Sequence, residues 1–164
     1  DDFTMPISGF PDPFIVCCFI DDNRLFIALF HNKTQMHYHF IYNDNRKKVE
    51  GEVVSMKMDC TSKNFPYKVF ANDENNESYI FYRQGQVFTV NNTDPNEYKF
   101  ARMTEMDLGQ MYLVNNKALI ARSSSRILFF KIIEDEESGE RVWTLYNSLA
   151  IRGFIYYIKG NTKI

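Results

Sequence analysis

Two histidines separated by one residue, in His37-Tyr38-His39, form the strongest metal-like pattern of this sequence. In a strand, residues two apart point to the same face, so both imidazoles could reach one ion, with His31 nearby across a turn. No Cys or carboxylate completes a known ligand spacing around them. We therefore expect His37 and His39 on a solvated strand face, with Tyr38 and its same-face neighbours directed inward, and no bound metal.

Three cysteines, Cys17, Cys18 and Cys60, could serve in redox or metal chemistry. Adjacent strand residues point to opposite faces, so Cys17 and Cys18 cannot easily hold one ion, and their spacing is not that of a redox C-x-x-C motif. An odd count is also a poor framework for disulfides. We expect structural thiols, with one of the adjacent pair facing the core, which suits a reducing cytoplasmic compartment.

Acid–base catalysis would need paired carboxylates in a cleft. The obvious acids are Asp21, Asp22, Asp73, Glu74 and the run Glu134-Asp135-Glu136-Glu137. All of them fall in segments that read as turns, where solvated carboxylates are expected. The sequence has no nucleophile elbow, phosphate-binding glycine loop or dinucleotide fingerprint. We therefore predict no catalytic, cofactor-binding or metal residue and no cofactor.

The charge pattern argues against nucleic acid and membrane partners. The formal net charge is −2, and the only basic cluster is the short Arg46-Lys47-Lys48. No apolar run reaches the roughly 18 residues that a membrane helix requires, and Phe14–Ile20 is too short for one.

The elements that must position these residues are short strands joined by polar turns. Asn and Asp suit such turns because they tolerate the left-handed conformation and bond their own backbone. Four Asn- or Asp-bearing turns, each between two β-type runs, begin at positions 21, 72, 115 and 159, at intervals of 51, 43 and 44 residues. They are Asp21–Asn23, Asn72–Glu77, Asn115–Lys117 and Lys159–Asn161.

Each of these hairpins is followed by two further strands, so the chain reads as four-stranded antiparallel repeats of about 44 residues. The repeats cover approximately 14–60, 65–105 and 108–150, with the start of a fourth at 151–164. Thr104–Leu108 reads as a single helical turn between the second and third repeats. The fold class is therefore all-β. The predicted strands are Phe14–Ile20, Leu25–Phe30, Met36–Tyr42, Val49–Met58, Tyr67–Phe70, Tyr79–Tyr82, Val87–Val90, Tyr98–Met103, Met111–Val114, Ala118–Ala121, Ile127–Ile133, Val142–Tyr146 and Phe154–Ile158.

This repeat resembles the blade of a WD40-like β-propeller. The pairs that close its third strands are Tyr42-Asn43, Val90-Asn91 and Ile133-Glu134, where that family has Trp-Asp. The resemblance implies a non-catalytic scaffold that binds other proteins of a multi-subunit assembly through a loop face. We expect it in the cytoplasm, in a cytoskeletal or ciliary assembly.

Other readings of the repeat remain open. Three four-stranded repeats also describe a β-trefoil, which would bind a carbohydrate or a receptor, and another β-barrel or sandwich is the third possibility. Some propellers are hydrolases with acids or metals at the central channel. The first strand of each repeat here contains few acids, which favours the scaffold over the hydrolase.

Overall fold

A computed structural model describes residues 14–31, 33–58, 64–115 and 117–151, and these residues contain twelve β-strands and no helix. The predicted all-β class is thus confirmed. The first four strands are β1 (Phe14–Phe19), β2 (Arg24–His31), β3 (Met36–Asn43) and β4 (Lys48–Lys57). The next four are β5 (Pro66–Asn72), β6 (Glu77–Tyr82), β7 (Gln86–Asn91) and β8 (Tyr98–Arg102). The last four are β9 (Met111–Val114), β10 (Ala118–Ser123), β11 (Arg126–Glu134) and β12 (Arg141–Ala150).

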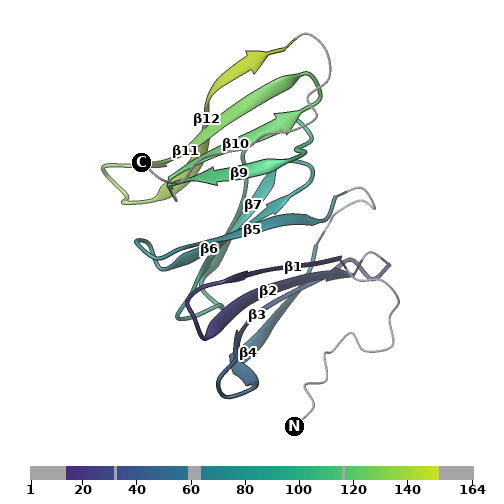
Figure 1. Cartoon of the computed structure of the whole chain (residues 1–164), viewed down its shortest axis with the longest axis vertical. Helices are drawn as coiled ribbons and strands as arrows, with labels where there is room; N and C mark the ends of the chain where they lie inside the picture. The colour runs from purple at the N-terminus through teal and green to yellow at the C-terminus, as the bar shows by residue number, and fades with distance from the viewer. Residues whose placement is uncertain (1–13, 32, 59–63, 116, 152–164) are drawn as a thin grey trace. The chain divides into compact units, whose positions relative to one another are not determined.

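The strands form three four-stranded sheets, each built from consecutive strands in up-and-down order (Figure 1). We call them the first, second and third sheets in chain order. Every registered strand pair is antiparallel, because each connection is a short turn. No repeat is divided between two packed sheets, as a trefoil or sandwich would require.

The chain divides into two compact units. The first unit holds the first and second sheets, and the second unit holds the third sheet together with residues 84–86. The predicted fourth repeat lies outside the described residues apart from Ile151, and so does Cys60.

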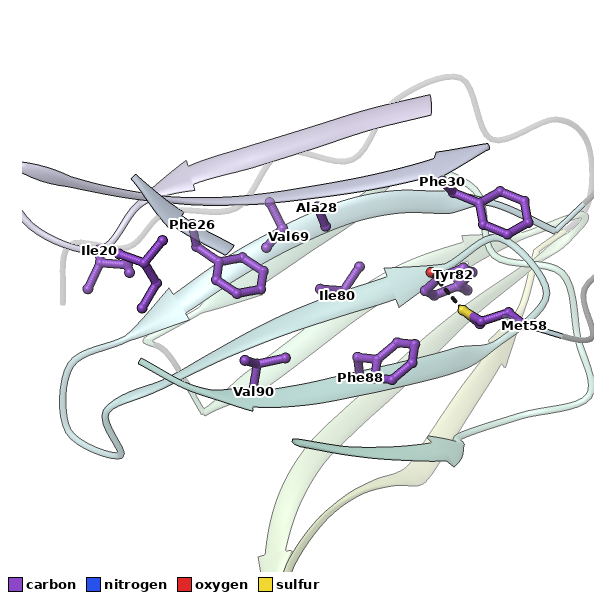
Figure 2. Close-up of a cluster of buried hydrophobic side chains, with 11 residues drawn as sticks. Ile20, Phe26, Ala28, Phe30, Met58, Val69, Ile80, Tyr82, Phe88 and Val90 are labelled. Carbon is purple, nitrogen blue, oxygen red and sulfur yellow. Dashed lines mark hydrogen bonds between the residues drawn. The ribbon is translucent and has the colours of Figure 1, made fainter. Parts of the chain in front are cut away.

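The core of the first unit lies between its two sheets. The first sheet contributes Phe26, Ala28, Phe30 and Ile41, and the second contributes Val69, Ile80, Tyr82, Phe88 and Val90 (Figure 2). These side chains alternate along their strands with side chains of the opposite face, as the period of two in a strand dictates. Complete burial of one such large side chain stabilises a fold by about 1.5–3 kcal/mol, so the facing sheets hold each other in place.

The turns use Asn and other non-glycine residues in left-handed conformations. Asn76 has φ +52° and Asn115 φ +50°, each in the first hairpin turn of its sheet. This confirms the turn chemistry expected from the sequence, in which Asn replaces Gly.

The segment between β8 and β9 is not helical, so the predicted helical turn at Thr104–Leu108 is wrong. Its polar backbone groups are used by neighbouring strands and turns instead. The carbonyl of Gly85 accepts from Met103 N at 2.8 Å and from Thr104 N at 3.3 Å, and the Asp107 carbonyl accepts from Ser123 Oγ at 2.6 Å. An isolated turn of five residues cannot offset the cost of helix nucleation against such bonds.

Gly85 lies so close to this segment that no larger residue can take its place. Its φ is +91°, and a Cβ added there would stand 2.3 Å from the Thr104 carbonyl oxygen. We expect Gly85→Ala to lower the free energy of unfolding by more than about 2 kcal/mol, measured by urea denaturation. The matched control is Gly139→Ala, where φ is +68° but no atom lies within 4 Å of the added Cβ. It should cost only the backbone strain of about 1 kcal/mol, and equal losses in the two variants would contradict the clash.

Candidate functional site

His37 and His39 are buried, so their predicted place on a solvated face is wrong. Both side chains are 0 % exposed and face the second sheet. The strand pairing explains this: His37 lies opposite Phe30 and His39 opposite Ala28, both members of the core between the sheets. Tyr38 belongs to the opposite face, where it packs with Leu29 and Phe40. β3 is largely buried on both faces, and alternation alone cannot decide which face is inward in such a strand.

The two imidazoles form a continuous hydrogen-bonded chain across the sheet interface. His37 Nδ1 lies 2.7 Å from the hydroxyl oxygen of Tyr82 on β6, and His37 Nε2 lies 2.9 Å from His39 Nδ1. His39 Nε2 lies 2.8 Å from the carbonyl oxygen of Pro95. The His37 ring also stacks on Phe88, with centroids 4.7 Å apart. We call this chain of Tyr82, His37, His39 and Pro95 the histidine chain.

Burial keeps both histidines of this chain neutral. Desolvation lowers the pKa of His39 from 6.5 to about 4, although the bond to the Pro95 carbonyl opposes this. The pKa of His37 lies well below its ordinary value because the ring is desolvated and His39 is beside it. Because both ring nitrogens of each imidazole already have a partner, the chain joins the two sheets and leaves no free ligand position.

His31 is not part of the histidine chain, because it shares the other face of β2 with Leu29. Its Nδ1 lies 2.8 Å from Thr34 Oγ1 within the following turn. Among the described residues, no group of three or more His, Cys, Asp or Glu side chains is placed to hold a metal ion.

A second polar assembly is exposed at one end of the first unit. We call it the turn surface, and it consists of residues 20–23, 44–47, 73–76 and 92–97, the first and third turns of both sheets. Each turn is closed by a side chain that accepts backbone N–H groups. Asp21 Oδ1 accepts from the N–H groups of Asn23 and Arg24, both at 2.9 Å, and Asn91 Oδ1 accepts from those of Thr93 and Asp94, at 2.8 and 2.9 Å.

Hydrogen bonds also join the four turns to one another. Asp44 N donates to the Asn23 carbonyl at 2.7 Å, and Asn92 N donates to the Asn76 carbonyl at 2.9 Å. Arg24 Nη1 crosses between the sheets to the Asn92 carbonyl at 3.3 Å. The turn surface is therefore one connected layer and not four independent loops.

Arg24 is the charged centre of this layer. Its Nε lies 2.8 Å from Asp21 Oδ2, and its Nη1 lies 3.9 Å from Glu50 Oε2. The pKa of Asp21 lies below its ordinary value, because the Asn23 N–H and then the Arg24 guanidinium stabilise the carboxylate.

A shallow depression of about 310 Å³ opens on the second sheet beside the turn surface. It is lined by Glu77, Thr89, Asn91, Glu97, Tyr98 and Lys99. The sequence does not indicate Glu77 and Glu97 as a pair, because they lie twenty positions apart with strand β7 between them. No local spacing in the sequence predicts that these two residues line one depression. Only the pairing of the strands places them there.

The remaining predicted candidates are dispersed. Cys18 packs against the core, and burial raises the pKa of its thiol to about 12, while Cys17 is exposed. One of the pair thus faces inward, as expected. Asp21, Asp22, Asp73 and Glu74 are exposed in turns. The acidic run is exposed as well, with Glu134 as the last residue of β11 and the other three acids after the strand. The Asn115–Lys117 turn belongs to the second unit, apart from the other two predicted recognition turns.

Sequence comparisons give no relative for this chain: no protein-family model matches it, and no curated protein matches it. Within the described part of the chain, no helix is long and apolar enough to cross a membrane.

Solved structures do resemble it. A Bacteroides uniformis protein described as a candidate 6-phosphogluconolactonase matches with a TM-score of 0.53 at 13 % identity, over 84 % of this chain and 42 % of that one. Hsv2 of Kluyveromyces lactis matches with a TM-score of 0.44 at 10 % identity, over 85 % of this chain and 38 % of that one.

The three consecutive antiparallel sheets, together with the first of these likenesses, define the fold as that of a β-propeller, with each sheet one blade. The chain spans about two fifths of the length of these solved structures. At such identity the likeness concerns the fold and carries no activity.

The histidine chain predicts a specific dependence of stability on pH. The unfolded chain binds protons to His39 below pH 6.5, whereas the folded chain does so only near pH 4. The contribution of His39 is thus complete above pH 6.5, and about 3 kcal/mol of unfolding free energy is lost as the pH falls to about 4. We expect urea denaturation to show this fall, and the double variant His37→Phe, His39→Leu to show a shallower one. An equal slope in both proteins between pH 6.5 and 5 would contradict it.

Proposed function

We propose that this chain is a non-catalytic propeller module that binds other proteins within a larger assembly. The observation that carries the proposal is the turn surface, in which side-chain caps and turn-to-turn hydrogen bonds fix four exposed turns as one layer. A fixed surface loses little conformational entropy on binding, so more of the contact energy is available for affinity.

The charges of the turn surface indicate the kind of partner. Seven acidic residues stand there against Arg46 and Lys47, with Arg24 directly beside them; Lys47 is already paired with Asp44 at 2.6 Å and Arg24 with Asp21 at 2.8 Å. The acidic residues are Asp21, Asp22, Asp44, Asp73, Glu74, Asp94 and Glu97. An acidic excess favours a basic protein segment and repels nucleic-acid phosphates and anionic membranes.

The proposal extends to family and location. We assign the blades to the WD40-like type, although the turns of this chain rely on Asn and Asp. We place the protein in the cytoplasm, within a cytoskeletal or ciliary assembly. The free thiols of Cys17 and Cys18 support a reducing compartment.

The turn surface can be tested by charge reversal with a matched control. The variant Asp73→Lys, Glu74→Lys changes the acidic turn of the second blade, and Glu136→Lys, Glu137→Lys makes the same charge change in an exposed turn of the second unit. We expect proteins that co-purify with the unmodified chain to be lost from the first variant, at least tenfold, and kept by the second. Equal retention by both variants would remove the turn surface from the binding site.

A hydrolase is the second candidate, favoured only by the depression that brings Glu77 and Glu97 together with Tyr98 and Lys99. We expect hydrolysis of 6-phosphogluconolactone and of simple esters to proceed at the rate of buffer alone. Hydrolysis above that rate, abolished by Glu77→Gln or Glu97→Gln and kept by Glu136→Gln, would replace the scaffold with an enzyme.

A further inference from the structure

The hydrogen-bond directions of the histidine chain follow from its one obligate acceptor. The Pro95 carbonyl oxygen can only accept, so His39 Nε2 carries a proton, and in the neutral ring Nδ1 has the lone pair. His37 Nε2 must therefore donate to His39 Nδ1, and His37 Nδ1 must accept from the Tyr82 hydroxyl. In the neutral state every bond of the chain runs from Tyr82 towards Pro95.

Met58 supplies a second acceptor at the Tyr82 end. Its Sδ lies 3.2 Å from the Tyr82 hydroxyl oxygen, and both side chains are buried in the core (Figure 2). The geometry allows the Tyr82 hydroxyl to donate to this sulfur, but the hydroxyl has a single proton, and in the neutral state His37 Nδ1 must accept it, so the bond to the sulfur is then not made. Thioether sulfur is a weak acceptor, and it would accept the hydrogen bond of the Tyr82 hydroxyl if this hydroxyl turned away from His37.

We propose that the histidine chain takes up one proton by reversing the direction of its hydrogen bonds, with Met58 as the acceptor that completes the reversed state. The hydrogen-bonded path from Tyr82 to Pro95 then survives the first protonation and is interrupted by the second.

The reversal balances with one added proton. The incoming proton binds the Tyr82 oxygen on the side of Met58, and the original hydroxyl proton moves to His37 Nδ1. The proton of His37 Nε2 moves to His39 Nδ1, so the positive charge ends on His39, which keeps its bond to the Pro95 carbonyl. Every transfer follows a hydrogen bond of the neutral state, at 2.7 and 2.9 Å.

The described side chains around His37 and His39 offer no counter-charge, so the added positive charge is accommodated by this proton relay. His37 and His39 are opposite Phe30 and Ala28 on β2 and Met56 and Val54 on β4. From β6, β7 and β8 their ring contacts are Tyr82, Phe88 and Tyr98. Among these described neighbours the two tyrosines are the only titratable groups, and no carboxylate or Lys or Arg side chain is present to balance an imidazolium.

The second proton has no such route. It would have to bind His37 Nε2, which would set two N–H groups against each other where the nitrogen atoms are 2.9 Å apart. The bond between the histidines, which both lie on β3, would break, and the hydrogen-bonded path from Tyr82 to Pro95 would be interrupted within the first blade. Desolvation and the neighbouring His39 lower the pKa of His37 well below its ordinary value, which agrees with a neutral His37 beside a charged His39.

Nitrogen-15 NMR of the complete chain tests the reversal through the tautomer of each ring. At pH 7 we expect both neutral rings to carry the proton on Nε2. As the pH falls towards 4, His39 should become doubly protonated while His37 changes to the Nδ1–H tautomer. A folded acid form in which His37 keeps Nε2–H would overturn the proposal.

A variant tests the role of the sulfur. Met58→Leu preserves volume but removes the acceptor, so His39 should protonate at a pH lower by about half a unit or more, with its tautomer at pH 7 unchanged. Met56→Leu is the control, because Met56 packs against the same core, whereas the sulfur bonded to the Tyr82 hydroxyl is that of Met58. Identical titration of the two variants would overturn the proposal, and if Met58→Leu does not fold, the tautomers of the unmodified chain decide.

Discussion

The first unit depends on the satisfaction of polar groups that are buried between two sheets. A buried imidazole without partners would cost more than the apolar contacts around it supply, so His37 and His39 fix the spacing and register of the blades. His37 can reach Tyr82, and His39 can reach Pro95, only when the first and second sheets face each other in one alignment. Apolar packing holds these sheets together, and the histidine chain selects how they meet.

The same turn chemistry serves both folding and recognition. The turns contain Asp21, Asn43, Asn72 and Asn91 because an oxygen two or three residues before a backbone N–H can close the turn without glycine. These caps leave further acidic and amide groups facing solvent at one end of the unit. The surface that we propose for binding is thus a consequence of how the hairpins close.

Fold and function are separated in this protein. The propeller architecture is shared with a structure of 13 % identity, and nothing in that likeness selects a partner or a reaction. Among the described residues, the depression lined by Glu77 and Glu97 and the turn surface are two polar features that face solvent. The excess of acidic groups on the turn surface gives it a defined complementary partner, which the mixed charges of the depression do not.

The sequence by itself determined the strands, the turns between them and the antiparallel order, because strand runs and Asn/Asp turns are local signals. The strand Met36–Asn43 shows where these local signals end: it is largely buried on both faces, so the burial of His37 and His39 depended on which face met the second sheet. The segment 104–108 is likewise non-helical because Gly85 and Ser123, distant in sequence, bond its backbone. Only the tertiary structure decided these points, and it also joined Asp21–Asn23 with Asn72–Glu77, since contacts across sheets leave no mark in a local pattern.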